Sequence, residues 1–333
     1  MQKKLRWGIL STAKIARTKV IPALFNSAHN EVVAIASRTL ASAQTCAQEL
    51  AIPTAYSSYE ELLADPNVDA IYNPLPNDLH VPWSIAALKA GKHVLCEKPI
   101  GLDTADTEQL IAASRAQPQL KVMEAFMYRF HPQWQAVKQW LAEGLIGEVK
   151  ALQAYFTYNN HEPDNIRNNP AAGGGALMDI GCYGISVARW VFDAEPVQLV
   201  AQLDLHPQYQ VDQLALLNVQ FPKGGMASVL CGTKMESGQG VYISGSLGSI
   251  TLERPFYCVG DEPNVVLVRR DTVVTRHEFP GMDHYQFMVD AFAESCFKDL
   301  AVPTPLSDAL ANMQVIDAAF SSARSGLWQA LPN

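Results

Sequence analysis

The first third of the chain alternates short apolar runs with longer stretches in which apolar residues recur every three or four positions. The short runs predict buried strands, and the longer recurrence predicts helices. Predicted strands cover residues 5–10, 31–36, 54–56, 68–73, 93–96 and 121–126. Predicted helices cover residues 15–27, 40–50, 81–90 and 103–116. This alternation predicts βαβ units and a doubly wound, Rossmann-type parallel sheet, whose ligand lies beyond the carboxyl ends of the strands.

The rest of the chain follows a different pattern, with runs of strands joined by short turns. Predicted strands cover residues 148–158, 197–205, 212–221, 226–234, 240–244, 249–252 and 265–269. Predicted helices cover residues 130–144, 179–191, 283–298 and 306–325. The pattern favours an α+β domain with a large mixed, mostly antiparallel sheet. Because 333 residues exceed one ordinary core, we predict two domains within an α/β chain, residues 1–126 and 127–333.

Composition narrows the function classes. The net charge of −8 argues against a surface for nucleic acid or anionic membrane, and no run is long enough to span a bilayer. The six cysteines show no CxxC pairing, which predicts reduced thiols and a cytoplasmic enzyme. The eight histidines show no HExxH or clustered spacing, so we predict no metal site.

The turn after the first strand is a candidate phosphate loop, formed by Ser11, Thr12, Ala13, Lys14 and Ile15. The dinucleotide fingerprint would place glycines where Ser11 and Ala13 stand. Small residues still allow a close approach of the backbone, and the helix N-terminus supplies amide donors to a pyrophosphate. A tight turn without a ligand is the alternative.

The end of the second strand indicates which dinucleotide is bound. Enzymes that bind NAD carry an acidic residue here for the ribose hydroxyls, whereas this chain has Ser37 and Arg38. A hydroxyl and a guanidinium suit a 2′-phosphate, so the sequence favours NADP over NAD. The alternative is that Arg38 is a solvated cation at the start of a helix.

Two further loops follow predicted strands and are candidates for the same cofactor site. Their candidate residues are Asn73, Pro74, Leu75, Asn77, His80, Glu97 and Lys98. An ammonium group at a strand end could stabilise an alkoxide or lower the pKa of a neighbour. A lone lysine at this position is more often a surface charge.

A glycine triplet precedes the helix that carries the candidate chemistry. Asp179 and Tyr183 are four residues apart, which on a helix places both side chains on one face, one turn apart. A carboxylate beside a phenol can support proton transfer, although a helix start with an acidic first turn is the alternative reading. A free Tyr has a pKa near 10, so a base at this position needs a nearby cation.

These motifs together resemble the Gfo/Idh/MocA family of NAD(P)-dependent oxidoreductases. The resemblance covers nearly the whole chain and depends on the segments WGIL at 7–10, SR at 37–38, AGKHVLCEKP at 90–99, MEAF at 123–126 and GGGALMDIGCYG at 173–184. Many family members have His where Tyr183 stands. The Tyr variant resembles the NADP-dependent D-xylose 1-dehydrogenases, the dimeric dihydrodiol dehydrogenases and the glucose–fructose oxidoreductases.

The resemblance implies a role for several residues. Tyr183 is then the acid/base, Lys98 supports it, and Asp179 orients the substrate hydroxyl or the lysine. Arg167 matches an arginine that lies near the cofactor or substrate. The resemblance also implies a cis bond before Pro99, and a homodimer or homotetramer formed through the other face of the C-terminal sheet.

The sequence therefore predicts an NADP-dependent enzyme that transfers a hydride between nicotinamide and a sugar hydroxyl or carbonyl, as in an aldose 1-dehydrogenase. Three alternatives stay open: a trans-dihydrodiol dehydrogenase, an enzyme that recycles a bound cofactor between two sugars, and a non-catalytic NADP-binding sensor. Met127 stands where the dihydrodiol enzymes have Trp, which weakens the first. The expected partner is a small molecule, with no nucleic acid and no membrane.

Overall fold

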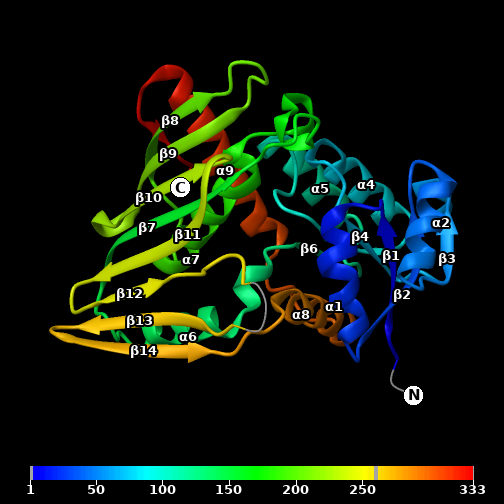
Figure 1. The fold of residues 1–333 in the computed structure, drawn as a ribbon, viewed down its shortest axis with the longest axis horizontal. Coiled ribbons are helices and arrows are strands. Elements are labelled where there is room, and N and C mark those ends of the chain that lie inside the picture. Colours follow the sequence, from blue (N-terminus) through cyan, green and yellow to red (C-terminus); the bar gives the residue numbers. More distant parts are fainter. Residues whose placement is uncertain (1–2, 259–261, 333) are drawn as a thin grey trace. The chain divides into compact units, whose positions relative to one another are not determined.

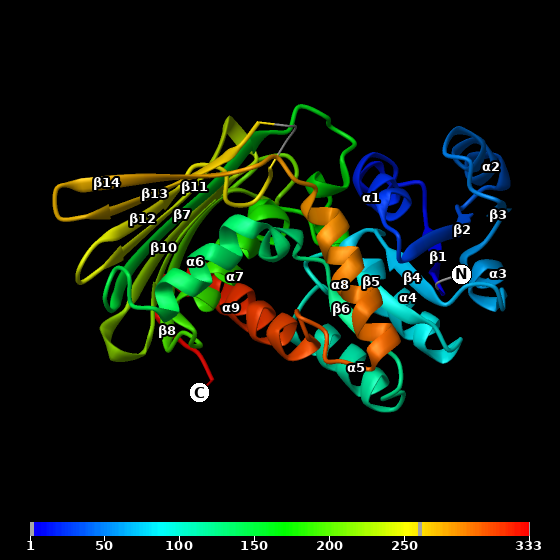
Figure 2. The same ribbon diagram turned by 90° about the horizontal axis from the view of Figure 1, so that it is seen from below.

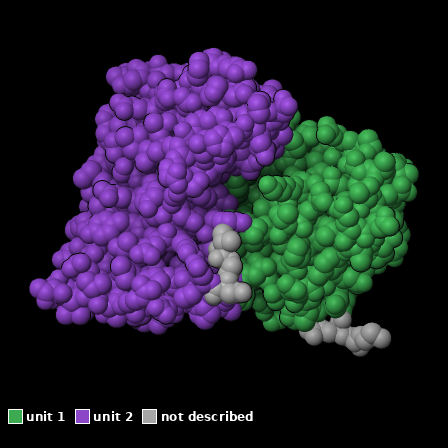
Figure 3. Space-filling model, viewed as in Figure 1, with its two compact units in different colours: residues 1–127, 283–310 green, residues 128–282, 311–333 purple. Residues whose placement is uncertain are grey.

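The computed structural model describes residues 3–258 and 262–332, which divide into two compact units (Figures 1 and 3). Unit 1 contains residues 1–127 and 283–310, and unit 2 contains residues 128–282 and 311–333. Among the described residues, no helix is long and apolar enough to cross a membrane.

Unit 1 is built on a parallel sheet with strand order β3-β2-β1-β4-β5-β6. Its described strands are β1 (Leu5–Leu10), β2 (Asn30–Ala36), β3 (Thr54–Tyr56), β4 (Ala70–Asn73), β5 (His93–Cys96) and β6 (Val122–Glu124). Its helices are η1 (Ala16–Val20), α1 (Ile21–Asn26), α2 (Leu40–Glu49), α3 (Tyr59–Ala64), α4 (Asn77–Lys89), α5 (Thr104–Arg115), η2 (Met127–Phe130, whose first residue alone is in unit 1) and α8 (His284–Lys298). The predicted Rossmann layout is confirmed. Helix α4 begins four residues earlier than predicted, with Pro82 inside it.

The predicted second domain, residues 127–333, differs from the observed units because residues 283–310 belong to unit 1. Helix α8 packs beside α1 (Figure 2). Its Asp290 accepts hydrogen bonds from Ser27 and Asn30, and Asn30 in turn accepts one from the Trp7 indole at 2.7 Å. The Phe292 ring lies 5.4 Å from the Trp7 ring. These long-range contacts unite the late helix with the first βαβ unit.

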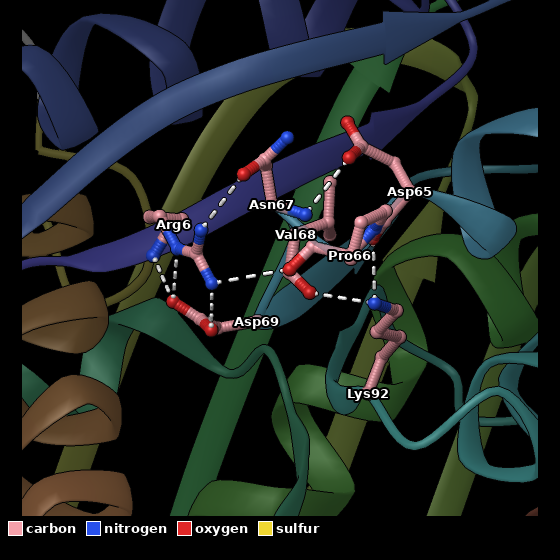
Figure 4. Close-up of polar contacts among 7 residues, drawn as sticks. All are labelled: Arg6, Asp65, Pro66, Asn67, Val68, Asp69 and Lys92. Carbon is pink, nitrogen blue, oxygen red and sulfur yellow. Dashed lines mark hydrogen bonds and ion pairs between the residues drawn. The ribbon is translucent and has the colours of Figure 1, made fainter.

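A polar cluster at the amino-terminal edge of the parallel sheet fixes the turn before β4 (Figure 4). Arg6 makes a two-pronged ion pair with Asp69, at 2.8 and 2.9 Å. The buried Lys92 ammonium donates to the carbonyls of Asp65 and Val68, both at 2.7 Å. Burial lowers the pKa of Lys92. Because ligands of such sheets bind at the opposite edge, we assign this cluster a structural role.

Unit 2 is built on a mixed sheet with strand order β14-β13-β12-β11-β7-β10-β9-β8-β15, in which only the β7–β10 pair among the described pairs is parallel. Its strands are β7 (Val149–Asn159), β8 (Gln198–Leu205), β9 (Asp212–Gln220), β10 (Met226–Gly232), β11 (Lys234–Gly245), β12 (Ser249–Leu252), β13 (Asn264–Arg270), β14 (Val273–Phe279) and β15 (Gln329–Ala330). The sequence prediction missed β14 and β15, and gave β11 too short a range.

One face of this sheet is covered by helices of the same unit, as Figure 2 shows. They include α6 (Pro132–Ala142), the π-helical turn η5 (Leu177–Gly181) and α7 (Cys182–Phe192). Short 3-10 turns lie at Ile166–Asn168 (η3), Pro170–Ala172 (η4) and Pro222–Gly224 (η6). Helix α9 (Leu306–Ser325) begins in unit 1 and continues in unit 2. Side chains of η5 and α7 pack on β7 and β10, which places the predicted Asp179–Tyr183 segment against the centre of the sheet.

Candidate active site

The candidate phosphate loop leaves β1 through a backbone conformation that glycine adopts most readily. Ser11 has a φ of +77°, in the left-handed region, at the position where the dinucleotide fingerprint expects glycine. The Ser11 hydroxyl accepts a hydrogen bond from the Ala13 amide at 3.2 Å. Lys14 and Ile15 open a helix that continues into η1 and α1. The turn thus fits a dinucleotide: small side chains lie at a strand end and precede a helix N-terminus.

Other predicted cofactor residues lie at the same edge of the sheet. Ser37 and Arg38 follow β2, Pro74 and Asn77 follow β4, and Glu97 follows β5. Since these strands are parallel to β1, their carboxyl ends meet at one edge, where doubly wound sheets bind ligands. Ser37 is buried and Arg38 is exposed, so a hydroxyl and a cation border the end of β2 without a carboxylate between them.

Hydrogen bonds to the Glu97 carboxylate hold the loop that carries Lys98. The carboxylate of Glu97 accepts a hydrogen bond from the Tyr72 hydroxyl at 2.7 Å and one from the Lys98 amide at 3.3 Å. Burial and the neighbouring Glu97 raise the pKa of Tyr72 well above its ordinary value, so its hydroxyl remains a donor. The bond between Lys98 and Pro99 is cis, as the resemblance implied. Tyr72 and Glu97 thereby anchor the backbone that carries the ammonium.

Two of the residues predicted to bind the cofactor have fully buried side chains that brace these loops. Asn73 donates to the His80 carbonyl at 2.9 Å and accepts from the Leu75 amide at 3.3 Å. The ring nitrogens of His80 lie 2.7 Å from the carbonyls of Pro99 and Leu75. Burial lowers the pKa of His80 to about 4, although both carbonyls favour the charged form. His80 joins the loop after β4 to the loop that holds Lys98.

The glycine triplet of unit 2 is required by close backbone packing. Gly173 ends η4 with a φ of +73°. A Cβ on Gly174 would lie 2.5 Å from the Arg167 carbonyl oxygen. Gly175 has a φ of +113°, and a Cβ there would lie 2.0 Å from an oxygen of Asp212. The triplet therefore lets the chain pass between the Arg167 turn and the Asp212 carboxylate immediately before the helix with Asp179 and Tyr183.

Asp212 supports the start of that helix. Its carboxylate accepts the Leu177 amide at 2.6 Å, which satisfies a donor that the helix itself leaves unpaired. Burial raises the pKa of Asp212 to about 6, against the opposing effect of the backbone donors around it. The sequence offered no signal for this contact, because Asp212 lies at the start of a strand 35 residues away.

The Asp179 carboxylate is held by two donors on one oxygen. The Arg167 Nε lies 2.7 Å from Oδ2, and the Tyr158 hydroxyl donates to the same atom at 2.7 Å. The Asp179 side chain is 12% exposed. Asp179 raises the pKa of Arg167, so the guanidinium stays charged. Arg167, predicted to lie near the cofactor or substrate, is thus an ion-pair partner of Asp179.

Tyr183 lies one helical turn after Asp179 in an aromatic cage. Its side chain is 4% exposed, and its ring lies 5.6 Å from Phe156, 5.5 Å from Phe256 and 5.9 Å from Tyr128. The Tyr128 hydroxyl bonds to Ser186, one turn further along α7, at 2.8 Å. The predicted one-face arrangement of Asp179 and Tyr183 is present, but it spans the junction between η5 and α7. Such π-helical turns are frequent at functional sites.

Sequence reasoning missed the aromatic residues that surround this helix. Phe156 and Tyr158 belong to β7, and Phe256 lies in the segment after β12. The first two lie two residues apart on a predicted strand, a spacing that places both side chains on one face. Within the described ranges, no group of three or more His, Cys, Asp or Glu side chains could hold a metal ion.

Two protein-family models match this chain, one in each unit. Residues 5–126 match the model for the oxidoreductase family with an NAD-binding Rossmann fold, and residues 134–251 match the GFO/IDH/MocA C-terminal domain. An uncharacterized oxidoreductase of Rhizobium meliloti is 40% identical, over 98% of this chain and 99% of its own. A D-xylose 1-dehydrogenase (NADP(+)) of Haloferax volcanii is 35% identical, over 97% and 98%.

A solved structure extends the likeness to three dimensions. The 3-ketoreductase KijD10 of Actinomadura kijaniata, in complex with NADP and TDP-benzene, superimposes with a TM-score of 0.91 at 31% identity, over 96% of this chain and 98% of that one. Unit 1 is an NAD(P)-binding Rossmann domain. The chain belongs to the Gfo/Idh/MocA family of oxidoreductases.

Proposed function

We propose that this protein is an NADP-dependent dehydrogenase that acts on a sugar hydroxyl, of the aldose 1-dehydrogenase type, with D-xylose as the first candidate substrate. The observation that carries this proposal is the caged phenol of Tyr183 one turn after the arginine-paired Asp179. The name of the Haloferax relative, similar over nearly the full length, supports the substrate class.

In this proposal Tyr183 takes the proton of the substrate hydroxyl during oxidation and returns it during reduction. Asp179, fixed by Arg167, accepts a hydrogen bond from a substrate hydroxyl and so orients the sugar. Lys98 supplies the positive charge that the family resemblance assigns to it. Bound NADP would supply the hydride chemistry, and the phosphate loop and strand ends of unit 1 would hold it.

The preference for NADP over NAD is part of the proposal. Ser37 and Arg38 offer a hydroxyl and a guanidinium to a 2′-phosphate, and no carboxylate follows β2 to bind a free ribose hydroxyl. The name of the Haloferax enzyme specifies NADP, and NADP is present in the structure of the Actinomadura reductase.

The test is the initial rate of NADPH formation with D-xylose, D-glucose and a trans-dihydrodiol, repeated with NAD. We expect turnover on a pentose or hexose, and a kcat/KM for NADP at least about tenfold above that for NAD, which corresponds to about 1.4 kcal/mol. Equal use of NAD would contradict the cofactor assignment. Firm NADP binding with no turnover on any compound would support the non-catalytic sensor.

A second candidate, a trans-dihydrodiol dehydrogenase, has one structural observation in its favour. The rings of Phe156, Phe256 and Tyr128 around Tyr183 would suit a flat, apolar ring near the acid/base. A higher kcat/KM on the trans-dihydrodiol than on either sugar would favour this candidate.

We also propose that the uncovered face of the unit 2 sheet forms a subunit contact. Leu216, Met226 and Tyr242 point to this face by strand register and are 37%, 62% and 41% exposed. Large apolar residues that a sheet face leaves exposed suit an interaction surface, and symmetric dimers are the commonest homo-oligomers. Light scattering should give twice or four times the chain mass of 36.5 kDa, and Met226→Lys should reduce that mass; a monomer would contradict the proposal.

A further inference from the structure

Two side chains of strand β7, Phe156 and Tyr158, contact the candidate acid/base Tyr183 and its neighbour Asp179. Phe156 packs edge-on against the Tyr183 ring, with centroids 5.6 Å apart. Tyr158, two residues later, donates its hydroxyl to Asp179 at 2.7 Å. The pairs run in opposite order along the two elements, 156 with 183 and 158 with 179, so the strand and the helix lie antiparallel at this point.

The expected distance between residues 156 and 158 along β7 is close to the expected distance between residues 179 and 183 along the helix. Residues two apart on a strand point to one face and are separated by about 6.6 Å. Residues four apart on a helix are separated by about 6 Å along its axis. One face of β7 can therefore contact Asp179 and Tyr183 at the same time without distortion of either side chain.

A bulge in the neighbouring strand β11 fixes the end of β7 that carries Tyr158. The pairing of β7 with β11 shifts register between Lys234 and Gly238, which leaves extra residues of β11 beside Tyr158. The Thr157 hydroxyl donates to the Glu236 carbonyl of this bulge at 2.6 Å. Bulges next to active sites re-aim side chains, and here the neighbouring residue, Tyr158, reaches the helix.

We propose that Tyr158 is a positioning residue for the reaction: its hydroxyl, together with Arg167, fixes the Asp179 carboxylate so that it meets a substrate hydroxyl in one orientation relative to Tyr183. Tyr158 acts through Asp179 and is not itself a reacting group. The proposal deepens the proposed function and depends on it.

The physical basis is the convergence of two donors on Oδ2 of Asp179. Terminal torsions such as χ2 of aspartate are broad, so each donor narrows the orientations that the carboxylate can adopt. Tyr158 adds a donor from a different element, β7, to the one that Arg167 supplies. Burial has the largest effect on the pKa of Tyr158 and the neighbouring Asp179 the next largest, and both raise it. The hydroxyl therefore stays protonated near neutral pH and remains a hydrogen-bond donor.

The test is Tyr158→Phe, which keeps the ring and removes the donor. Tyr56→Phe is the matched control, because the Tyr56 hydroxyl also donates to a carboxylate, Asp65, at 3.1 Å, outside the machinery assigned above. We expect Tyr158→Phe to lower kcat on the hydroxyl substrate by about 10- to 100-fold, as small misplacements of a reacting geometry do, with an unchanged Kd for NADPH by fluorescence titration. The control should keep kcat within about twofold.

A double variant shows whether Tyr158 acts through Asp179 or only stabilises the fold. In an Asp179→Asn background the hydroxyl of Tyr158 has no carboxylate to orient, so Tyr158→Phe should change kcat by less than about twofold there. A full additive loss, or wild-type kcat and KM in the single variant, would overturn the proposal.

A crystal structure of Tyr158→Phe tests whether Tyr158 orients the Asp179 carboxylate, without any measurement of turnover. Asp179 in a new orientation, or in two, would support positioning by Tyr158. An Asp179 carboxylate that stays in place on Arg167 would overturn it. If the wild-type protein turns over none of the substrates, the proposed function fails, and this structural comparison still tests the role of Tyr158.

Discussion

Replacing Tyr183 with phenylalanine is expected to lower kcat on the hydroxyl substrate by about 10²- to 10⁴-fold, the range for loss of a general acid/base, or about 3–5 kcal/mol of barrier. The ring of the variant still fills the cage of Phe156, Phe256 and Tyr128, so the fold should not change. The Kd for NADPH should also stay close to the wild-type value, because the predicted cofactor residues other than Arg167 belong to unit 1. Steady-state kinetics and a fluorescence titration measure both quantities.

The matched control is Tyr128→Phe, which removes a hydroxyl from the same aromatic cage. That hydroxyl bonds to Ser186, which has no assigned role in the reaction, so its loss should change kcat by less than about tenfold. Similar losses in the two variants would mean that Tyr183 supplies packing and polarity but is not the acid/base. An unchanged kcat in Tyr183→Phe would remove the phenol from the mechanism.

Replacing Gly175 with alanine is expected to destabilise unit 2 by about 3–5 kcal/mol and to abolish most activity. Two costs add: a φ of +113° strains any residue with a Cβ, and that Cβ would lie 2.0 Å from Asp212 Oδ1. The Asp212 carboxylate would have to move, and the amide of Leu177 would lose its acceptor. Because Asp179 and Tyr183 lie one and two turns further on, the displacement should reach both.

Gly224→Ala separates the two costs. Gly224 has a comparable φ of +83°, but nothing lies within 4 Å of the position a Cβ would occupy. We expect this variant to lose only about 1 kcal/mol, the backbone cost alone, and to keep its activity. Thermal unfolding should therefore show a markedly larger drop in Tm for Gly175→Ala. Equal drops would mean that Asp212 yields at no cost and that the triplet is needed for backbone conformation only.

Much of the first unit could be predicted because its signals are local. Each buried strand is a short apolar run, and each helix has its own cap or period, so the sheet and its ligand edge follow from pattern and handedness. Ser37, Arg38 and Lys98 were placed at that edge by the same reasoning. Strand β14, by contrast, is largely exposed and gives no alternating apolar signal, so the sequence prediction missed it.

The roles of His80 and Asn73 needed the structure. Asn73 ends β4 and His80 lies in the first turn of α4, close to the ligand edge, but their side chains point inward to backbone carbonyls of α4 and of neighbouring loops. Sequence position fixes the edge at which a residue lies. It does not determine which way a side chain points there, because that depends on the loops from other βα units that pack around it.

The sequence by itself determined the parallel sheet, its ligand edge, and the four-residue spacing of Asp179 and Tyr183, since each depends on residues close together in the chain. Tertiary structure alone decided what surrounds that pair. Arg167, Asp212 and the β7 pair Phe156 and Tyr158 come from three separate elements, and residues 283–310 return to the first unit through contacts with Trp7 and Asn30. These partners depend on strand register and on close packing at glycines, which no local pattern records.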